Sequence, residues 1–238
     1  MTLLSFLRHS LRRFVRHLYW LHLRWRNRGK PAQQIFSAYW QRNHWRNAES
    51  CSGDGSTLAY TEALRAALPP LLVRHGIHSM LDLPCGDFHW FSHVALPSGV
   101  HYTGADIVKP MLTQLQAQYG GPGRSFTTLD ALTADLPAVD LWMCRDLIFH
   151  LPTAAVWQVL DSFLRSRIGH LLITSHDAAD AVNGDTFMGG FRLINLRLPP
   201  FALPEPDERL KDYIEGFPPR HLLLYRRDTL NAWKRQLT

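Results

Sequence analysis

Short runs of apolar residues, several of them ending in an acidic residue, recur through residues 80–226. Such runs are typical of buried strands, and the longer segments between them have room for helices. The runs are residues 80–82, 101–106, 126–130, 139–144, 170–177 and 221–226. Strands that alternate with helices predict an α/β fold with a mostly parallel sheet and helices on both faces. We expect the last run, which follows a proline-rich loop, to be the edge strand that closes the sheet.

The part of the chain before this sheet has the pattern of three helices. Residues 3–25 carry apolar side chains at spacings of three and four, the period of one helical face. These side chains are Leu4, Leu7, Leu11, Phe14, Leu18, Leu21 and Trp25. A second helix is expected over residues 32–45. A third, residues 58–75, follows a loop rich in glycine and hydroxyl groups at residues 49–57, where Ser56 or Thr57 is the candidate N-cap.

The charge of the chain is divided unevenly between its two parts. Residues 1–48 hold ten Lys and Arg and no acidic residue, whereas the remaining residues hold 16 basic and 20 acidic ones. The basic character therefore belongs to the N-terminal segment, and no nucleic-acid partner is expected for the mildly acidic body. We divide the chain into a basic amphipathic helix, residues 1–30, and one α/β domain, residues 31–238.

The N-terminal helix has three interpretations that its sequence leaves open. No apolar run approaches the roughly 20 residues that a membrane span needs. Arginines beside an apolar, aromatic face fit a helix that lies on an anionic membrane surface through residues 1–26, as on the inner face of the cytoplasmic membrane. A helix that packs on the domain and a mitochondrial transit peptide share these traits.

The three cysteines limit the redox chemistry and the metal chemistry that the chain can have. Cys51, Cys85 and Cys144 are an odd number without a CxxC spacing. This favours a reducing, cytoplasmic compartment and argues against a disulfide framework and a structural zinc. We expect no metal site. Cys85 stands in the most informative loop of the chain, where a small apolar role is favoured over a nucleophilic one.

That loop belongs to residues 80–88, MLDLPCGDF. An apolar run ends at Asp82 and turns at Gly86, a residue that permits a close approach of a ligand. In an open α/β sheet, ligands bind at the carboxyl ends of the strands. The stretch resembles motif I of class I S-adenosylmethionine (SAM) methyltransferases, acidic-x-Gly-x-Gly-x-Gly, with Pro84 and Cys85 in the region of the first two glycines. The resemblance implies a Rossmann-like sheet of seven strands and SAM as the cofactor.

The next two strand-like runs carry acidic residues at the positions that a doubly wound nucleotide-binding unit needs. Asp106 ends the second run, about 20 residues after the first, where a carboxylate accepts hydrogen bonds from both ribose hydroxyls. Asp130 ends the third run, and the resemblance implies a contact with the adenine amino group. The expected cofactor contacts are Asp82, Pro84, Cys85, Gly86, Asp87, Asp106, Ile107, Asp130, Ala131 and Arg145.

Candidate catalytic residues follow the fourth and fifth runs. Methyl transfer from a sulfonium needs mainly positioning of donor and acceptor, and a hydroxyl acceptor also needs a base. His150 and His176 are the two candidate bases. Arg145 would hold a phosphate or another anionic acceptor, and Asp146 would assist, anchor Arg145 or cap the helix that begins near Pro152.

The leading hypothesis is a SAM-dependent methyltransferase that acts on oxygen of a saccharide, a phosphate or a small molecule. Residues 35–61 are similar to a bacterial subgroup that is often encoded with surface-glycan genes, which implies a glycan acceptor. In the 49–57 loop, Gly53 and Gly55 fit a lid over the cofactor carboxylate, or a plain connector. A catalytically inactive SAM-binding or scaffold protein and a nucleic-acid methyltransferase are the alternatives. The latter is disfavoured because residues 144–147, CRDL, lack the Asn/Asp-Pro-Pro-Tyr/Phe pattern.

Overall fold

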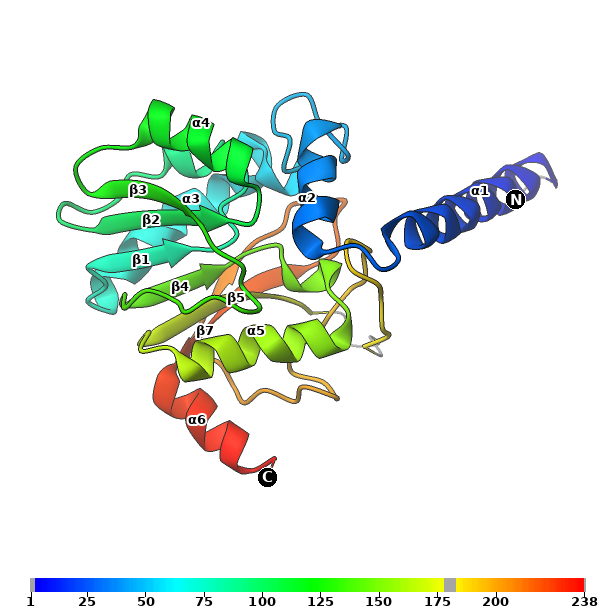
Figure 1. Cartoon of the computed structure of the whole chain (residues 1–238). Helices are drawn as coiled ribbons and strands as arrows, with labels where there is room; N and C mark the ends of the chain where they lie inside the picture. The colour runs from blue at the N-terminus through cyan, green and yellow to red at the C-terminus, as the bar shows by residue number, and fades with distance from the viewer. Residues whose placement is uncertain (1–2, 178–182, 238) are drawn as a thin grey trace.

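The computed structural model describes residues 3–177 and 183–237, with the side chains of the first helix described from Phe14 onward except Arg16. The chain forms one layered α/β unit with a projecting N-terminal helix (Figure 1). The helices are α1 (Leu3–Asn27), α2 (Ala32–Gln41), α3 (Leu58–Arg74), α4 (Lys109–Tyr119), α5 (Thr153–Arg165) and α6 (Arg227–Arg235). The strands are β1 (Ser79–Asp82), β2 (His101–Asp106), β3 (Arg124–Thr128), β4 (Leu141–Cys144), β5 (His170–His176), β6 (Glu208–Lys211) and β7 (Arg220–Arg226).

The seven strands form a single sheet in the order β3-β2-β1-β4-β5-β7-β6. β1 to β5 pair in parallel, and β7 is antiparallel to both β5 and β6. The predicted α/β fold with a seven-stranded, mostly parallel sheet is therefore confirmed.

The prediction of the closing strand was wrong. The run at residues 221–226 lies in β7, between β5 and β6, and the edge strand is β6. Only Leu210 of the four β6 residues is buried, and its neighbours include Glu208, Arg209 and Lys211. An edge strand buries little and is often charged. β6 therefore lacks the apolar run by which the other strands are recognised.

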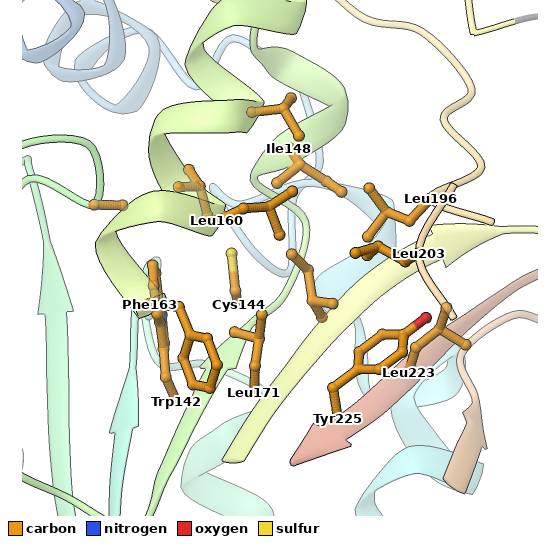
Figure 2. Packing of buried hydrophobic residues seen from close by; sticks show 14 of the residues in the cluster. Trp142, Cys144, Ile148, Leu160, Phe163, Leu171, Leu196, Leu203, Leu223 and Tyr225 are labelled. Carbon is orange, nitrogen blue, oxygen red and sulfur yellow. The ribbon is translucent and has the colours of Figure 1, made fainter. Parts of the chain in front are cut away.

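The two faces of the sheet bury separate cores because successive side chains of a strand point to opposite faces. On one face, Trp142, Leu171 and Tyr225 pack under α5 and α6, as Figure 2 shows in part. On the other face, Met143 and Leu172 pack under α3 and α4. Helices cover both faces of the sheet, so a ligand site is expected at the carboxyl ends of the parallel strands.

The helices of the N-terminal half begin and end for local reasons. The amide of Tyr60 donates to the hydroxyl of Thr57 (3.3 Å), so Thr57, and not the other candidate Ser56, caps α3. α2 ends at Gln41, four residues before the predicted end. Asn43 and Arg46 have φ of 42° and 56°, a left-handed conformation that a helix cannot include.

α1 both projects from the domain and is anchored to it (Figure 1). The predicted helix is present and extends to Asn27. Phe14, Leu18, Leu21 and Trp25 of the predicted apolar face are exposed, while Leu4, Leu7 and Leu11 are outside the described side chains. Leu23 and Asn27 are buried against α2 and the loop at residues 187–190. Among the described residues, no helix has the length and apolar character to cross a membrane.

Candidate active site

A cavity of about 360 Å³ opens at the carboxyl ends of the parallel strands. Its walls come from the loops after β1, β2, β3, β4 and β5, from α2 and the 49–57 loop, and from the loop between β6 and β7. Of the predicted site residues, those that line it are Asp82, Pro84, Cys85, Gly86, Asp106, Ile107, Asp130, Ala131, Arg145, Asp146, His150 and His176. The structure thus brings twelve of the thirteen predicted residues to one cavity.

Asp87 is the predicted cofactor contact that does not line the cavity. Its carboxylate accepts hydrogen bonds from the Ser50 hydroxyl and the Cys51 amide, both at 2.8 Å. The Asp87 amide donates to the Ser52 hydroxyl (3.1 Å). Asp87 therefore fastens the 49–57 loop to the loop after β1. This loop is a fixed wall of the cavity in the structure, not a free connector.

Gly86 is required by the neighbouring loop. It has φ of 55°, and a Cβ at this position would collide with the Ser52 hydroxyl oxygen. A side chain at residue 86 is therefore disfavoured by backbone strain and by the 49–57 loop, even with no ligand in the cavity. The sequence predicts that Gly86 permits the close approach of a ligand, and the structure adds this second reason for a glycine.

The cavity holds two buried carboxyl groups with raised pKa values. Asp106 accepts hydrogen bonds from the amides of Val108 (3.0 Å) and Gly86 (3.3 Å), and burial raises the pKa of Asp106 to about 6. Asp82 accepts the Tyr102 hydroxyl (2.8 Å), and burial raises the pKa of Asp82 to about 8. A buried carboxylate is costly without a positive charge nearby. A ligand that brings a positive charge or hydroxyl donors would offset this cost.

Cys85 lies in the same loop and is buried. Burial, together with the charges of Asp106 and Asp82, raises the pKa of the Cys85 thiol well above its usual value. Because the thiolate is the nucleophilic form, this thiol is poorly suited to nucleophilic attack. The geometry agrees with the predicted role of a small apolar side chain.

One wall of the cavity contains two ion pairs that contact each other. We call these four residues the four-charge cluster: Arg145, Asp146, Asp212 and Arg220. Arg145 donates to both carboxylate oxygens of Asp212, at 3.1 and 2.8 Å. Arg220 donates to Asp146 (2.9 Å) and to the Asp212 carbonyl oxygen (2.9 Å). Side-chain exposure is 3% for Arg145 and 0% for Asp212. Two positive and two negative charges thus compensate one another, and Asp146, with a side-chain exposure of 24%, is the most exposed of the four.

The four-charge cluster also binds the N-terminal loop. Arg145 donates to the Gly55 carbonyl oxygen (2.6 Å). A Cβ at Gly55 would lie 2.9 Å from the Asp146 carboxylate and 3.0 Å from the Arg220 guanidinium. The absence of a side chain at Gly55 therefore lets the 49–57 loop lie directly on the ion pair. The cluster joins segments before β1, after β4 and on both sides of the β6–β7 loop.

Asp146 has an unusual conformation within this cluster. Its φ is 59°, and its Oδ1 atom is buried with no hydrogen-bond partner among the described residues. Burial would raise the pKa of Asp146, but Arg145 and Arg220 hold the pKa below its usual value, so the side chain is a carboxylate. The proposed cap of α5 is made instead by Asp185, which accepts the Thr153 amide (2.7 Å).

The two candidate bases differ in the state of their rings. His150 Nδ1 lies 2.7 Å from the Gly190 carbonyl oxygen, which only accepts hydrogen bonds, so Nδ1 carries the proton and Nε2 is free to accept one. His176 Nδ1 instead accepts the Ile194 amide (3.3 Å), so its proton is on Nε2. Burial lowers the pKa of His150, and burial lowers the pKa of His176 to about 4. Both rings are neutral at pH 7, but only His150 presents Nε2 as an acceptor.

Aromatic side chains surround the His150 ring. Its centroid lies 4.5 Å from the ring of Phe149, 5.8 Å from that of Trp45 and 6.0 Å from that of Phe191. These rings come from the loop before α3, the loop after β4 and the loop after β5. Phe191 also lines the cavity and is 56% exposed, an unusual position for a large apolar ring unless a ligand covers it.

Several residues of the site were missed by the sequence analysis. Asp212 and Arg220 complete the four-charge cluster, and Phe191 and Phe217 line the cavity. These residues belong to no sequence motif. Proline and glycine, which indicate only a loop, are the only recognisable signals in these segments. In the described part of the chain, no group of three or more His, Cys, Asp or Glu side chains is arranged to hold a metal.

Comparisons with known proteins show a likeness in structure. No protein-family model and no curated protein matches the chain. A 1,6-didemethyltoxoflavin-N1-methyltransferase from Burkholderia thailandensis, crystallised with S-adenosylhomocysteine, is 14% identical over 82% of this chain and 86% of its own, with a TM-score of 0.57. The magnesium protoporphyrin IX methyltransferase of Synechocystis, crystallised with SAM, is 16% identical over 84% and 99%, with a TM-score of 0.56. The chain has the fold of these methyltransferases.

The same architecture is found in a protein with another activity. The [4+2]-cyclase SpnF is 18% identical over 71% of this chain and 70% of its own, with a TM-score of 0.51. A shared fold therefore does not decide the reaction, and function has to be argued from the residues of the site.

Proposed function

We propose that the protein is a SAM-dependent methyltransferase that transfers a methyl group to a hydroxyl of a small organic acceptor. One observation carries the proposal. The cavity that contains the carboxyl groups of Asp82 and Asp106 also contains His150, whose ring is held with Nε2 as an acceptor. Two bound-ligand neighbours of the same fold, with SAM and with S-adenosylhomocysteine, support the choice of cofactor.

The chemistry of the cavity suits this cofactor. The cofactor end, which we define by Asp82, Gly86, Asp106 and Asp130, offers three carboxyl groups to a ligand with a positive charge and a ribose diol. Asp106 would take the ribose hydroxyls, since each of its oxygens has a lone pair left beside the amide that it already accepts. When bound, SAM supplies an electrophilic methyl group and a neutral leaving group.

The acceptor end, which we define by Trp45, Phe149, His150 and Phe191, suits a ring that carries a hydroxyl. Flat apolar faces of aromatic rings and of sugars stack on such side chains. An anionic acceptor is disfavoured, because Arg145 and Arg220 are already paired with Asp146 and Asp212. The prediction that Arg145 holds a phosphate has this observation against it.

In the proposed reaction His150 takes the proton of the acceptor hydroxyl at Nε2. Burial keeps the pKa of His150 below its usual value, so the ring is neutral and able to accept a proton at pH 7. The hydrogen bond to Gly190 and the charge of Asp146 raise the pKa in opposition to burial, and both stabilise the imidazolium that forms. The rings around His150 limit the access of water.

The decisive experiment combines calorimetry with labelled-methyl transfer. We expect SAM to bind, and we expect His150→Ala to lower turnover by roughly 10²- to 10⁴-fold, the usual contribution of a general base. His176→Ala is the matched control and should lower turnover much less. A panel of phenols and a panel of free saccharides distinguish the two sources of a ring hydroxyl. No binding of SAM would reject the proposal, and binding without transfer to any acceptor would favour a SAM-binding or scaffold role.

A second proposal concerns the partner of α1. We propose that the exposed face of this helix binds an anionic membrane surface, which would place the enzyme on the cytoplasmic face of a membrane. Exposure is 58% for Phe14, 48% for Leu18, 43% for Leu21 and 74% for Trp25, so the face is not covered by the domain. Residues 1–48 supply ten basic side chains and no acidic one, which complements anionic lipid headgroups.

Vesicle sedimentation tests this second proposal. Vesicles that contain phosphatidylserine should sediment the parent protein, and the double variant Leu18→Ser with Trp25→Ser should bind more weakly. Val73→Ser removes an apolar side chain of intermediate exposure (66%) from α3 and is the control. Equal sedimentation of all three proteins, or equal binding to neutral phosphatidylcholine vesicles, would contradict the proposal. Deletion of residues 1–30 is a poor test because it removes the buried Leu23 and Asn27.

A further inference from the structure

The anchored end of α1 is joined to the active site through a chain of hydrogen bonds. The side-chain amide of Asn27 donates to the Tyr39 hydroxyl (2.6 Å) and to the Met188 carbonyl oxygen (3.1 Å). The Tyr39 hydroxyl donates to the Gly189 carbonyl oxygen (2.9 Å). Asn27 and Tyr39 are 7% and 2% exposed. Two of these hydrogen bonds therefore hold the loop at residues 187–190 to α1 and α2, and the third joins the two helices to each other.

The same loop holds His150 at two points. The Gly189 amide donates to the His150 carbonyl oxygen (2.8 Å). The Gly190 carbonyl oxygen accepts the proton of His150 Nδ1 (2.7 Å). The second bond determines the tautomer, since a carbonyl oxygen can only be paired with a protonated nitrogen. The ring of His150 thus depends on the position of one backbone carbonyl in a loop that α1 and α2 support.

Gly189 shows how closely these segments fit. It has φ of 78°, and a Cβ there would lie 2.8 Å from both the Tyr39 hydroxyl and a methyl group of Ile35, and 3.0 Å from the Asn27 amide. The loop backbone thus approaches the two helices as closely as only a glycine allows. The ring of Phe187 also lies edge-on to that of Trp20 in α1, with 5.2 Å between centroids.

We propose that Asn27 and Tyr39 are positioning residues for His150, which act through the 187–190 loop to hold the ring with Nε2 unprotonated. The N-terminal helix is then a structural part of the active site as well as a surface element. The proposal rests on the proposed function, because it gives His150 the role of base. Without the two side chains, the Gly190 carbonyl oxygen would move and the ring would sample the tautomer whose Nε2 cannot accept a proton.

Nitrogen-15 NMR of the histidine rings tests the proposal without cofactor or acceptor. In the parent protein, His150 should show a protonated Nδ1 and an unprotonated Nε2, with its signals assigned by their loss in His150→Gln. In Tyr39→Phe, the two nitrogen shifts should move toward each other as the tautomers mix. We also expect turnover to fall by about 10-fold with the affinity for SAM within roughly 2-fold, as for other residues that orient a catalytic side chain.

Tyr225→Phe is the matched control, because it removes another buried tyrosine hydroxyl that donates to a carbonyl oxygen, that of Pro204 (3.1 Å), outside the cavity. It should leave the His150 signals unchanged. If Tyr39→Phe does not fold, Asn27→Ala is examined by the same spectrum. Parent-like His150 signals in the folded variants, or an equal change in Tyr225→Phe, would overturn the proposal. Full turnover of His150→Ala would instead reject His150 as the base and leave the tautomer measurement to decide the positioning role.

Discussion

The cofactor end of the cavity is built from loops that directly follow β1, β2 and β3, whereas the acceptor end is built from segments that are distant in the chain. The bond between Arg145 and Gly55 spans 90 residues, that between Asp146 and Arg220 spans 74, and that between Tyr39 and Gly189 spans 150. The cofactor end follows from the sheet itself. The acceptor end exists only once the N-terminal helices and the C-terminal loops have packed on that sheet.

The two ends also differ in their charge balance. At the cofactor end, burial raises the pKa values of Asp82 and Asp106, to about 8 and about 6. The four-charge cluster beside the acceptor end is neutral as a whole. The difference supports the proposal that a ligand with a positive charge completes the cofactor end, whereas the proposed acceptor end would offer shape, aromatic surface and one base.

The largest effect is expected when one charge of the four-charge cluster is removed. Arg145→Ala leaves the fully buried Asp212 carboxylate without its bidentate partner. Loss of one member of a buried ion pair costs about 3–5 kcal/mol of unfolding free energy. Urea denaturation measures it. The double variant Arg145→Met with Asp212→Leu, which removes both charges, should be more stable than Arg145→Ala. A single variant as stable as the parent would show that the cluster does not hold the acceptor end.

A smaller effect, confined to the cofactor end, is expected for Asp106→Asn. The amide cannot accept hydrogen bonds through both of its polar atoms, so at least one charge-assisted bond to the ribose is lost. Such a bond contributes about 1.5–3 kcal/mol, and SAM should bind roughly 10- to 150-fold more weakly by calorimetry. Asp161→Asn, on the surface of α5, is the control. Unchanged affinity in Asp106→Asn would mean that the cofactor does not lie at this end.

The smallest effect concerns pH. The folded pKa of Asp82 is about 8, above the usual value of 3.8, so the folded protein binds this proton more tightly than the unfolded chain does. Its contribution to stability is therefore largest at low pH and is lost as pH rises through 8. Asp82→Asn should raise the melting temperature by a few degrees at pH 8.5 and by less at pH 6, while weakening SAM binding. An equal shift at both pH values would show that Asp82 does not titrate in this way.

Most of the cofactor end could be predicted from the sequence. Asp82, Asp106 and Asp130 were placed at this end because each closes an apolar run that marks a strand, and Gly86 was placed there by the likeness of its loop to motif I. Thr57 was found as a cap for the same local reason. The role of Asp87 was not, because its partners Ser50 and Cys51 lie in a loop that no strand or helix pattern places.

For the acceptor end the sequence supplied candidates but not their roles. The sequence places both His150 and His176 near strand ends and does not distinguish their roles. The structure separates them, since one ring faces the carbonyl oxygen of Gly190 and the other faces the amide of Ile194. Which backbone group meets a ring depends on the path of the loop after β5, and an irregular loop has no hydrophobic period from which its path can be read.

By itself the sequence determined most of the strands, the helices, and the ends of the strands where a ligand binds. These features depend on the period of apolar residues along the chain. It could not determine that β7 lies inside the sheet, that Arg220 meets Asp146, or that Asn27 supports the loop that holds His150. Those facts were decided by the tertiary structure. A charge or a hydrogen-bonding group has no preferred partner in the sequence, and packing alone brings the two together.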